Sequence, residues 1–219
     1  MKFIIIETTV SFNSIIMTSQ ELKDHIINFF QYAASNRIEL YNEFSMQHEL
    51  GIYLRDLLQS KQYKVQFERN ISFFGIQGTV KKEIDIVVYN DQEKFAIELK
   101  FPRNGAYPRR MFQFIEDICL VKQLKDNGFD GGCAVSLVDD EKFYSDKRLR
   151  TGGIYAYFRG QNPAPIGGVV KNPIKDDKPN QLIINGSFQV NWDDVKIVDR
   201  DTATKAAKSI QAKYYIIEM

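Results

Sequence analysis

The stretch 83-EIDIVVYNDQEKFAIELKFP-102 decides the fold, because it reads as two strands joined by a turn-forming Asn-Asp pair. Successive side chains of a strand point to opposite faces, so Glu98 and Lys100 project to the same face. Asp85 lies near the end of the preceding strand. We therefore expect two carboxylates and one ammonium group to converge at one place on the sheet.

This trio of side chains suits the hydrolysis of a phosphodiester. A hard divalent cation prefers oxygen ligands, and the attacking water must lose a proton close to the anionic phosphate. We expect Asp85 and Glu98 to hold Mg²⁺, with Mn²⁺ as a substitute. Lys100 would orient the water or offset negative charge on the phosphate oxygens.

The sequence around this stretch predicts a three-layer α/β/α core over residues 18–140. A capping box at 18-TSQE-21 begins a helix over residues 18–34, and a second helical pattern covers residues 38–60. The predicted strands at 63–69, 81–89 and 94–101 form an antiparallel meander. A helix over 108–126 and a strand over 133–138 follow, and a strand after a crossover helix pairs in parallel. The order αβββαβ thus predicts a mixed sheet.

The two ends of the chain are predicted to be additions to this core. Residues 1–17 read as an N-terminal extension or an edge strand. Residues 141–219 read as a β-rich extension of the same domain, with strands over 154–158, 181–185, 187–198 and 214–217. The pair Asn185 and Gly186 is expected to form a hairpin turn, and the segment 161–180, rich in Pro and Gly, is expected to be a surface loop.

Composition narrows the class of protein and the compartment. The 219 residues are 44% hydrophobic and 26% charged, which is typical of a globular domain with one substantial core. Two cysteines are too few for a disulfide framework or a zinc cluster. Glu7 interrupts the apolar N-terminal run before it reaches the length of a signal peptide, and no segment is long enough to span a membrane. These features predict a cytoplasmic protein.

The charge distribution favours a nucleic-acid partner more than the total charge does. The formal net charge is only +1, whereas proteins that neutralise phosphates usually carry a surplus of Lys and Arg. Residues 99–115, however, contain no acidic side chain. Within them, Arg103, Arg109 and Arg110 are candidates for contacts with the nucleic-acid backbone, and an ordinary solvated surface is the alternative.

The residues around the two strands resemble the PD-(D/E)XK nuclease superfamily. Asp85 matches the motif aspartate and 98-ELK-100 matches the E-X-K, although Ile84 stands where the family name has proline. The resemblance covers about residues 38–140, where the predicted order of elements also agrees. It implies a restriction-endonuclease-like fold, dependence on Mg²⁺ and cleavage of DNA.

The resemblance also implies roles for residues on the two flanking helices. Such nucleases often place a glutamate of the first core helix at the metal or its water shell. Glu49 is the residue implied here, and Glu43 is the competitor. A glutamine or basic residue on the helix after the E-X-K strand often contacts the bound water or the phosphate. Gln113 is the candidate, with an ordinary exposed helix residue as the alternative.

These features lead to a Mg²⁺-dependent endonuclease of restriction, phage-defence or repair type that acts on DNA. A homodimer is expected by symmetry, because a double-strand cut needs two sites. The alternative is a catalytically inactive nucleic-acid-binding module on the same fold. A weaker third hypothesis is a partner protein in which the ELK triplet is accidental.

Overall fold

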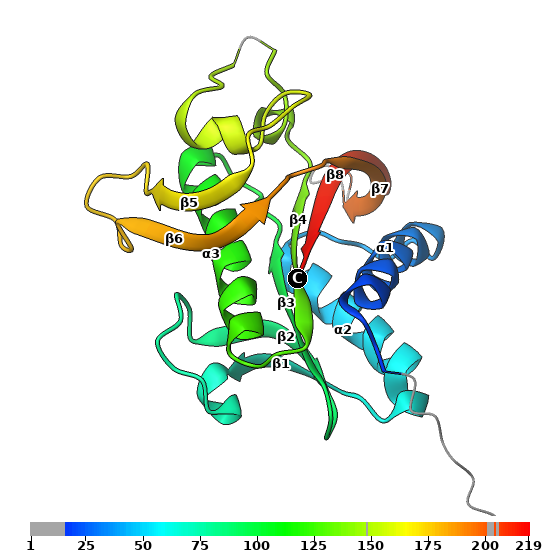
Figure 1. The fold of residues 1–219 in the computed structure, drawn as a ribbon. Coiled ribbons are helices and arrows are strands. Elements are labelled where there is room, and N and C mark those ends of the chain that lie inside the picture. The colour runs from blue at the N-terminus through cyan, green and yellow to red at the C-terminus, as the bar shows by residue number, and fades with distance from the viewer. Residues whose placement is uncertain (1–15, 148, 201–203, 205) are drawn as a thin grey trace, which may run out of the picture.

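The computed structural model of the protein describes residues 16–147, 149–200, 204 and 206–219 (Figure 1). Two helices, α1 (Ser19–Ser35) and α2 (Glu43–Leu58), come before the sheet, and α3 (Tyr107–Asp126) lies between its third and fourth strands in the chain. The predicted N-terminal extension falls, over residues 1–15, outside the described residues. The predicted helices at 18–34 and 108–126 are confirmed to within one residue at each end.

A mixed six-stranded sheet forms the centre of the molecule, in the order β1-β2-β3-β4-β8-β7. The first three strands form the predicted antiparallel meander, and β4 pairs in parallel with β3, as expected after a crossover helix. The other pairs are antiparallel. The strands are β1 (Lys64–Asn70), β2 (Glu83–Tyr89), β3 (Lys94–Lys100), β4 (Gly131–Val138), β7 (Asp193–Arg200) and β8 (Ala207–Glu218).

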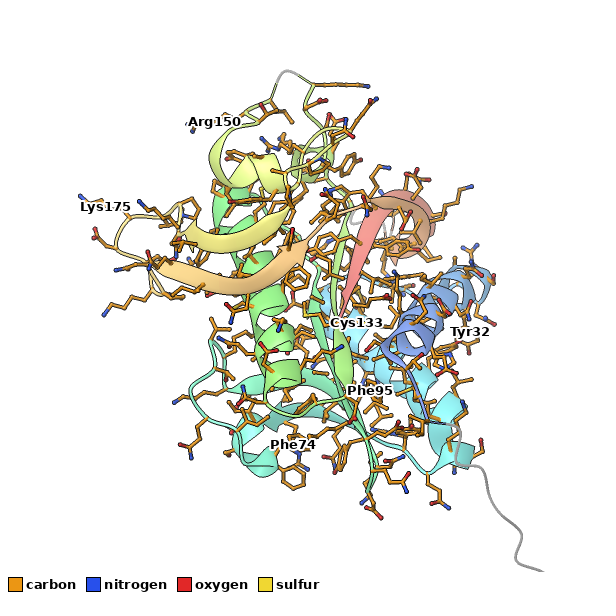
Figure 2. The ribbon with its side chains drawn as sticks, in the orientation of Figure 1. Tyr32, Phe74, Phe95, Cys133, Arg150 and Lys175 are labelled. Carbon is orange, nitrogen blue, oxygen red and sulfur yellow. The ribbon has the colours of Figure 1, made fainter. Side chains whose placement is uncertain are left out.

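Both faces of the sheet are covered. Helices α1 and α2 lie on one face, whereas α3 lies on the other together with a separate hairpin, β5 (Ile166–Lys171) and β6 (Gln181–Phe188) (Figure 1). Phe95 on β3 and Cys133 on β4 belong to the core beneath α1 and α2 (Figure 2). Alternate residues of β3 therefore face α3, and Glu98 is one of them.

Side-chain caps set where the first two helices begin. The predicted capping box of Thr18 and Glu21 is confirmed at α1. A second box, formed by Asn42 and Ser45, starts α2 at Glu43. The predicted start of this helix at residue 38 is wrong, because the preceding segment pairs with β7. The Leu40 N–H donates to the carbonyl oxygen of Val198, at 2.8 Å.

The C-terminal segment is β-rich, but several of its predicted elements are wrong. Residues Gly153–Tyr157 form a 3₁₀-helix where a strand was expected. Gly186 lies within β6 instead of in a hairpin turn, and the Pro- and Gly-rich segment contains β5. A Cβ atom on Gly167 would lie 2.5 Å from the carbonyl oxygen of Gly186, so glycine lets these two backbones approach. In the described residues, no helix has the length and apolar character needed to cross a membrane.

Candidate functional site

The strands β2 and β3 separate at the two predicted carboxylates. Their pairing runs from Tyr89↔Lys94 to Ile86↔Ile97 and stops there. Beyond that point the Asp85 N–H donates to Glu98 Oε1 at 3.1 Å, and the Leu99 N–H donates to Asp85 Oδ2 at 2.7 Å. The carboxylates therefore satisfy backbone N–H groups that the ladder would otherwise pair, and they lie next to each other.

Two residues that were not predicted as site residues complete the surroundings of Glu98. The Glu98 side chain is fully buried, and its Oε2 accepts a hydrogen bond from Nζ of Lys81, which lies just before β2. Lys81 Nζ also lies 2.9 Å from Oδ1 of Asp117, a buried residue of α3. The segment before β2, which carries Lys81, and helix α3, which carries Asp117, thus meet at Glu98.

Lys100 lies among oxygen atoms from several elements. Its Nζ lies 3.3 Å from Asp117 Oδ2, 3.8 Å from Asp85 Oδ2 and 3.3 Å from Glu43 Oε1. It also donates to the carbonyl oxygen of Leu99, at 2.7 Å. We define the carboxylate–lysine cluster as Glu43, Lys81, Asp85, Glu98, Lys100 and Asp117.

The structure brings Glu43 to this cluster and leaves Glu49 outside it. Besides its contact with Lys100, Glu43 accepts a hydrogen bond from the N–H of Phe101, at 3.1 Å. Glu49 lies six positions later, about 240° further around the helix axis, and lines pockets on the outer side of α2. Gln47, one turn after Glu43, donates to the carbonyl oxygen of Asp85 at 2.7 Å, so this face of α2 supports the strand end.

Burial and crowding shift the pKa values of the cluster. Burial raises the pKa of Asp85 to about 6, although the ammonium groups of Lys100 and Lys81 oppose the shift. Burial also raises the pKa of Glu98, and the neighbouring charge of Asp85 adds to it. For Lys100, burial lowers the pKa, but the carboxylates of Asp117 and Asp85 reverse the effect and the net pKa is raised. Burial therefore disfavours the ionised carboxylates. Because the cluster contains more carboxylates than ammonium groups, an added cation would stabilise their ionised form.

The chemistry of the donors fits Mg²⁺, because all of them are carboxylate oxygens. Oδ2 of Asp117 is buried and accepts no hydrogen bond from the described residues, although Lys100 lies nearby. No group of three or more Asp, Glu, His or Cys side chains in the described residues is arranged to hold a metal ion. Backbone N–H groups and Lys81 already engage oxygens of Asp85 and Glu98. Magnesium commonly uses one or two protein carboxylates and completes its shell with water and phosphate.

The predicted basic residues separate into two groups. Arg109, Arg110 and Gln113 line a pocket of 470 Å³ at the start of α3, where Arg110 Nη1 donates to Gln113 Oε1 at 2.9 Å. Within this group, Arg109 Nε lies 3.5 Å from Asp177 Oδ2, in an ion pair that is largely exposed. The other group is Arg103, which forms ion pairs with Asp139 at 2.7 Å and Asp199 at 2.5 Å. Its guanidinium group is therefore engaged within the protein.

The cluster residues missed in the sequence carried weak signals. Asp117 lies one turn after Gln113 on the same face of the predicted helix, but the adjacent Glu116 makes it look like one of two ordinary charged positions. A buried carboxylate at such a position indicates a cationic partner. The sequence predicts a strand that begins at Lys81, whereas β2 begins at Glu83, so Lys81 reaches the cluster from an irregular segment that the strand period does not describe.

Comparisons of the chain with known proteins identify no relative. No protein-family description matches the chain, and neither the curated proteins nor the solved structures give a significant match.

Proposed function

We propose that the protein is a Mg²⁺-dependent endonuclease that acts on DNA, related to the PD-(D/E)XK nucleases. The observation that carries the proposal is the meeting of Asp85, Glu98 and Lys100 at the point where two neighbouring strands separate. The mixed sheet with helices on both faces is compatible with that family. Restriction, phage defence or repair is the proposed setting.

Each residue has a role that follows from its position. Asp85 and Glu98 would hold the cation, which when bound supplies Lewis-acid activation of the phosphate and lowers the pKa of water. Lys100, fixed by its oxygen partners, would offset charge on the phosphate oxygens. Glu43 on α2 and Asp117 on α3 would hold Lys100 in place. The pocket with Arg109 and Arg110 would bind a flanking phosphate of the backbone.

Plasmid cleavage tests this function. Purified protein with Mg²⁺ or Mn²⁺ is expected to convert supercoiled DNA to nicked or linear forms, and a chelator should stop the reaction. Lys100→Ala is expected to lower the rate by about 100-fold or more, since it removes a charge at the reacting phosphate. Lys94→Ala, at the other end of the same strand, is the matched control and should retain the rate. Equal cleavage by wild type and Lys100→Ala would remove this mechanism.

One observation favours the alternative of an inactive nucleic-acid-binding module. Lys81 and backbone N–H groups already engage oxygens of Asp85 and Glu98. Such a module would bind DNA in a salt-sensitive manner without metal, and it would show no cleavage with any divalent ion.

The proportion of linear product in the plasmid assay would also test the proposed homodimer, because two sites acting together cut both strands.

A further inference from the structure

We propose that the ammonium group of Lys81 occupies a cation site between Glu98 and Asp117, and that a divalent cation enters this site by displacing Lys81. The inference rests on the proposed function, in which Asp85 and Glu98 hold the cation. It adds Asp117 as a further ligand beside Glu98, and Lys81 as a competitor of the metal. Lys81 would then set the concentration of divalent cation at which the site fills.

The first argument is the convergence of two buried oxygens on one position. The Glu98 side chain is 0% exposed and that of Asp117 is 4% exposed, and they come from β3 and α3. Both contact the same nitrogen, Lys81 Nζ. Buried carboxylates are costly unless a cation accompanies them, so this position in the fold requires positive charge.

The second argument is that one oxygen of Asp117 lacks a hydrogen bond. Its Oδ1 contacts Lys81, whereas its buried Oδ2 accepts no hydrogen bond within the described part of the chain, even with Lys100 Nζ at 3.3 Å. Even with two ammonium groups nearby, one oxygen of this carboxylate therefore lacks a hydrogen bond. A dication brings twice the charge to the same oxygens, and two carboxylates with water and phosphate are sufficient for magnesium.

The third argument is that Lys81 can leave while Lys100 cannot. The Lys81 side chain is 29% exposed and extends from an irregular segment, and its ammonium group sits on a flexible four-carbon stem. Lys100 is only 13% exposed, extends from a strand and has four oxygen partners. Of the two lysines at Asp117, Lys81 is therefore the one that exchanges with an incoming cation.

A titration with Mn²⁺ in the absence of nucleic acid tests the inference. Free Mn²⁺ is followed by electron paramagnetic resonance for the full-length protein and its variants. Lys81→Met keeps the length of the side chain and removes its charge, so we expect the dissociation constant for Mn²⁺ to fall by about tenfold or more. Lys81→Gln is a second neutral variant. Lys82→Met is the matched control, because Lys82 is adjacent and exposed, and it should bind as wild type does.

Asp117→Asn supplies the complementary arm. When it is combined with Lys81→Met, it should abolish the gain in affinity for Mn²⁺. Circular dichroism checks that each variant is folded. Unchanged Mn²⁺ affinity in both neutral Lys81 variants would overturn the inference, and plasmid cleavage by the wild type would then leave the proposed function standing. Absence of Mn²⁺ binding in every variant would overturn the inference as well. If no cleavage accompanies that absence, the proposed function falls with it.

Discussion

Glu93 is a buried carboxylate that joins the start of α1 to the meander. Its Oε2 accepts hydrogen bonds from the N–H of Met17, at 3.2 Å, and from the hydroxyl of Tyr63, while its Oε1 has no partner among the described residues. Burial, together with the hydrogen bond to Glu93, raises the pKa of Tyr63 to about 12. The phenol therefore remains protonated and donates this bond throughout the ordinary pH range.

Removing the Tyr63 hydroxyl, which donates to Glu93, should destabilise the protein. Tyr63→Phe keeps the ring and leaves the buried carboxylate with one donor fewer, so we expect the free energy of unfolding to fall by about 1–3 kcal/mol. Urea denaturation measures the change. Tyr32→Phe is the control, because Tyr32 is 45% exposed, and it should stay within about 0.5 kcal/mol of wild type. Equal effects of the two substitutions would contradict this role of Glu93.

At the level of elements, the cap of α2 also positions a residue of the cluster. The Asn42 side chain accepts from the N–H of Ser45 at 2.8 Å, and Glu43 is the first residue of the helix. Asn42→Ala should cost about 1 kcal/mol of stability and, by loosening the first turn, lower the rate of plasmid cleavage.

The chain provides a matched control for this prediction. Thr18 caps α1 with the same kind of box, and no member of the carboxylate–lysine cluster belongs to α1. Thr18→Ala should therefore lower stability by a similar amount and leave cleavage at the wild-type rate at a temperature where both variants are folded. A parallel loss of cleavage in the two variants would show that the cap of α2 has no specific effect on the site.

The elements that could be predicted are those set by local patterns. Alternation and turn residues predict β2 and β3, helical spacing predicts α1 and α3, and the strand period predicts that Glu98 and Lys100 share a face. The start of α2 could not be predicted, because residues before it pair with β7, far along the chain. Lys81 and Asp117 join the cluster only through tertiary packing. Gly186 resembles a turn residue locally, but it lies within β6, at the shift in register between β5 and β6.

For the whole molecule, the proposed function gives the basic stretch after β3 two purposes. Arg103 joins the end of β3 to Asp139, which follows β4, and to Asp199 on the edge strand β7, so it links the centre of the sheet to its edge. Arg109 is 59% exposed at its side chain and lies with Arg110 at the pocket of α3. Under the proposed function, stability and binding of nucleic acid would thus depend on different arginines.

Substitutions should separate these two purposes. Arg103→Ala is expected to lower the free energy of unfolding by about 1 kcal/mol, because its ion pairs are partly exposed, and to change DNA affinity little. Arg109→Ala with Arg110→Ala should leave stability nearly unchanged. It should weaken binding at every sequence and reduce the slope of log affinity against log salt by about 0.9 for each phosphate that is no longer neutralised. Fluorescence anisotropy with chelator, over a series of salt concentrations, measures the slope. The reverse pattern, in which Arg103→Ala reduces the slope and the double variant does not, would move the DNA path away from the pocket of α3 and toward the edge at β7.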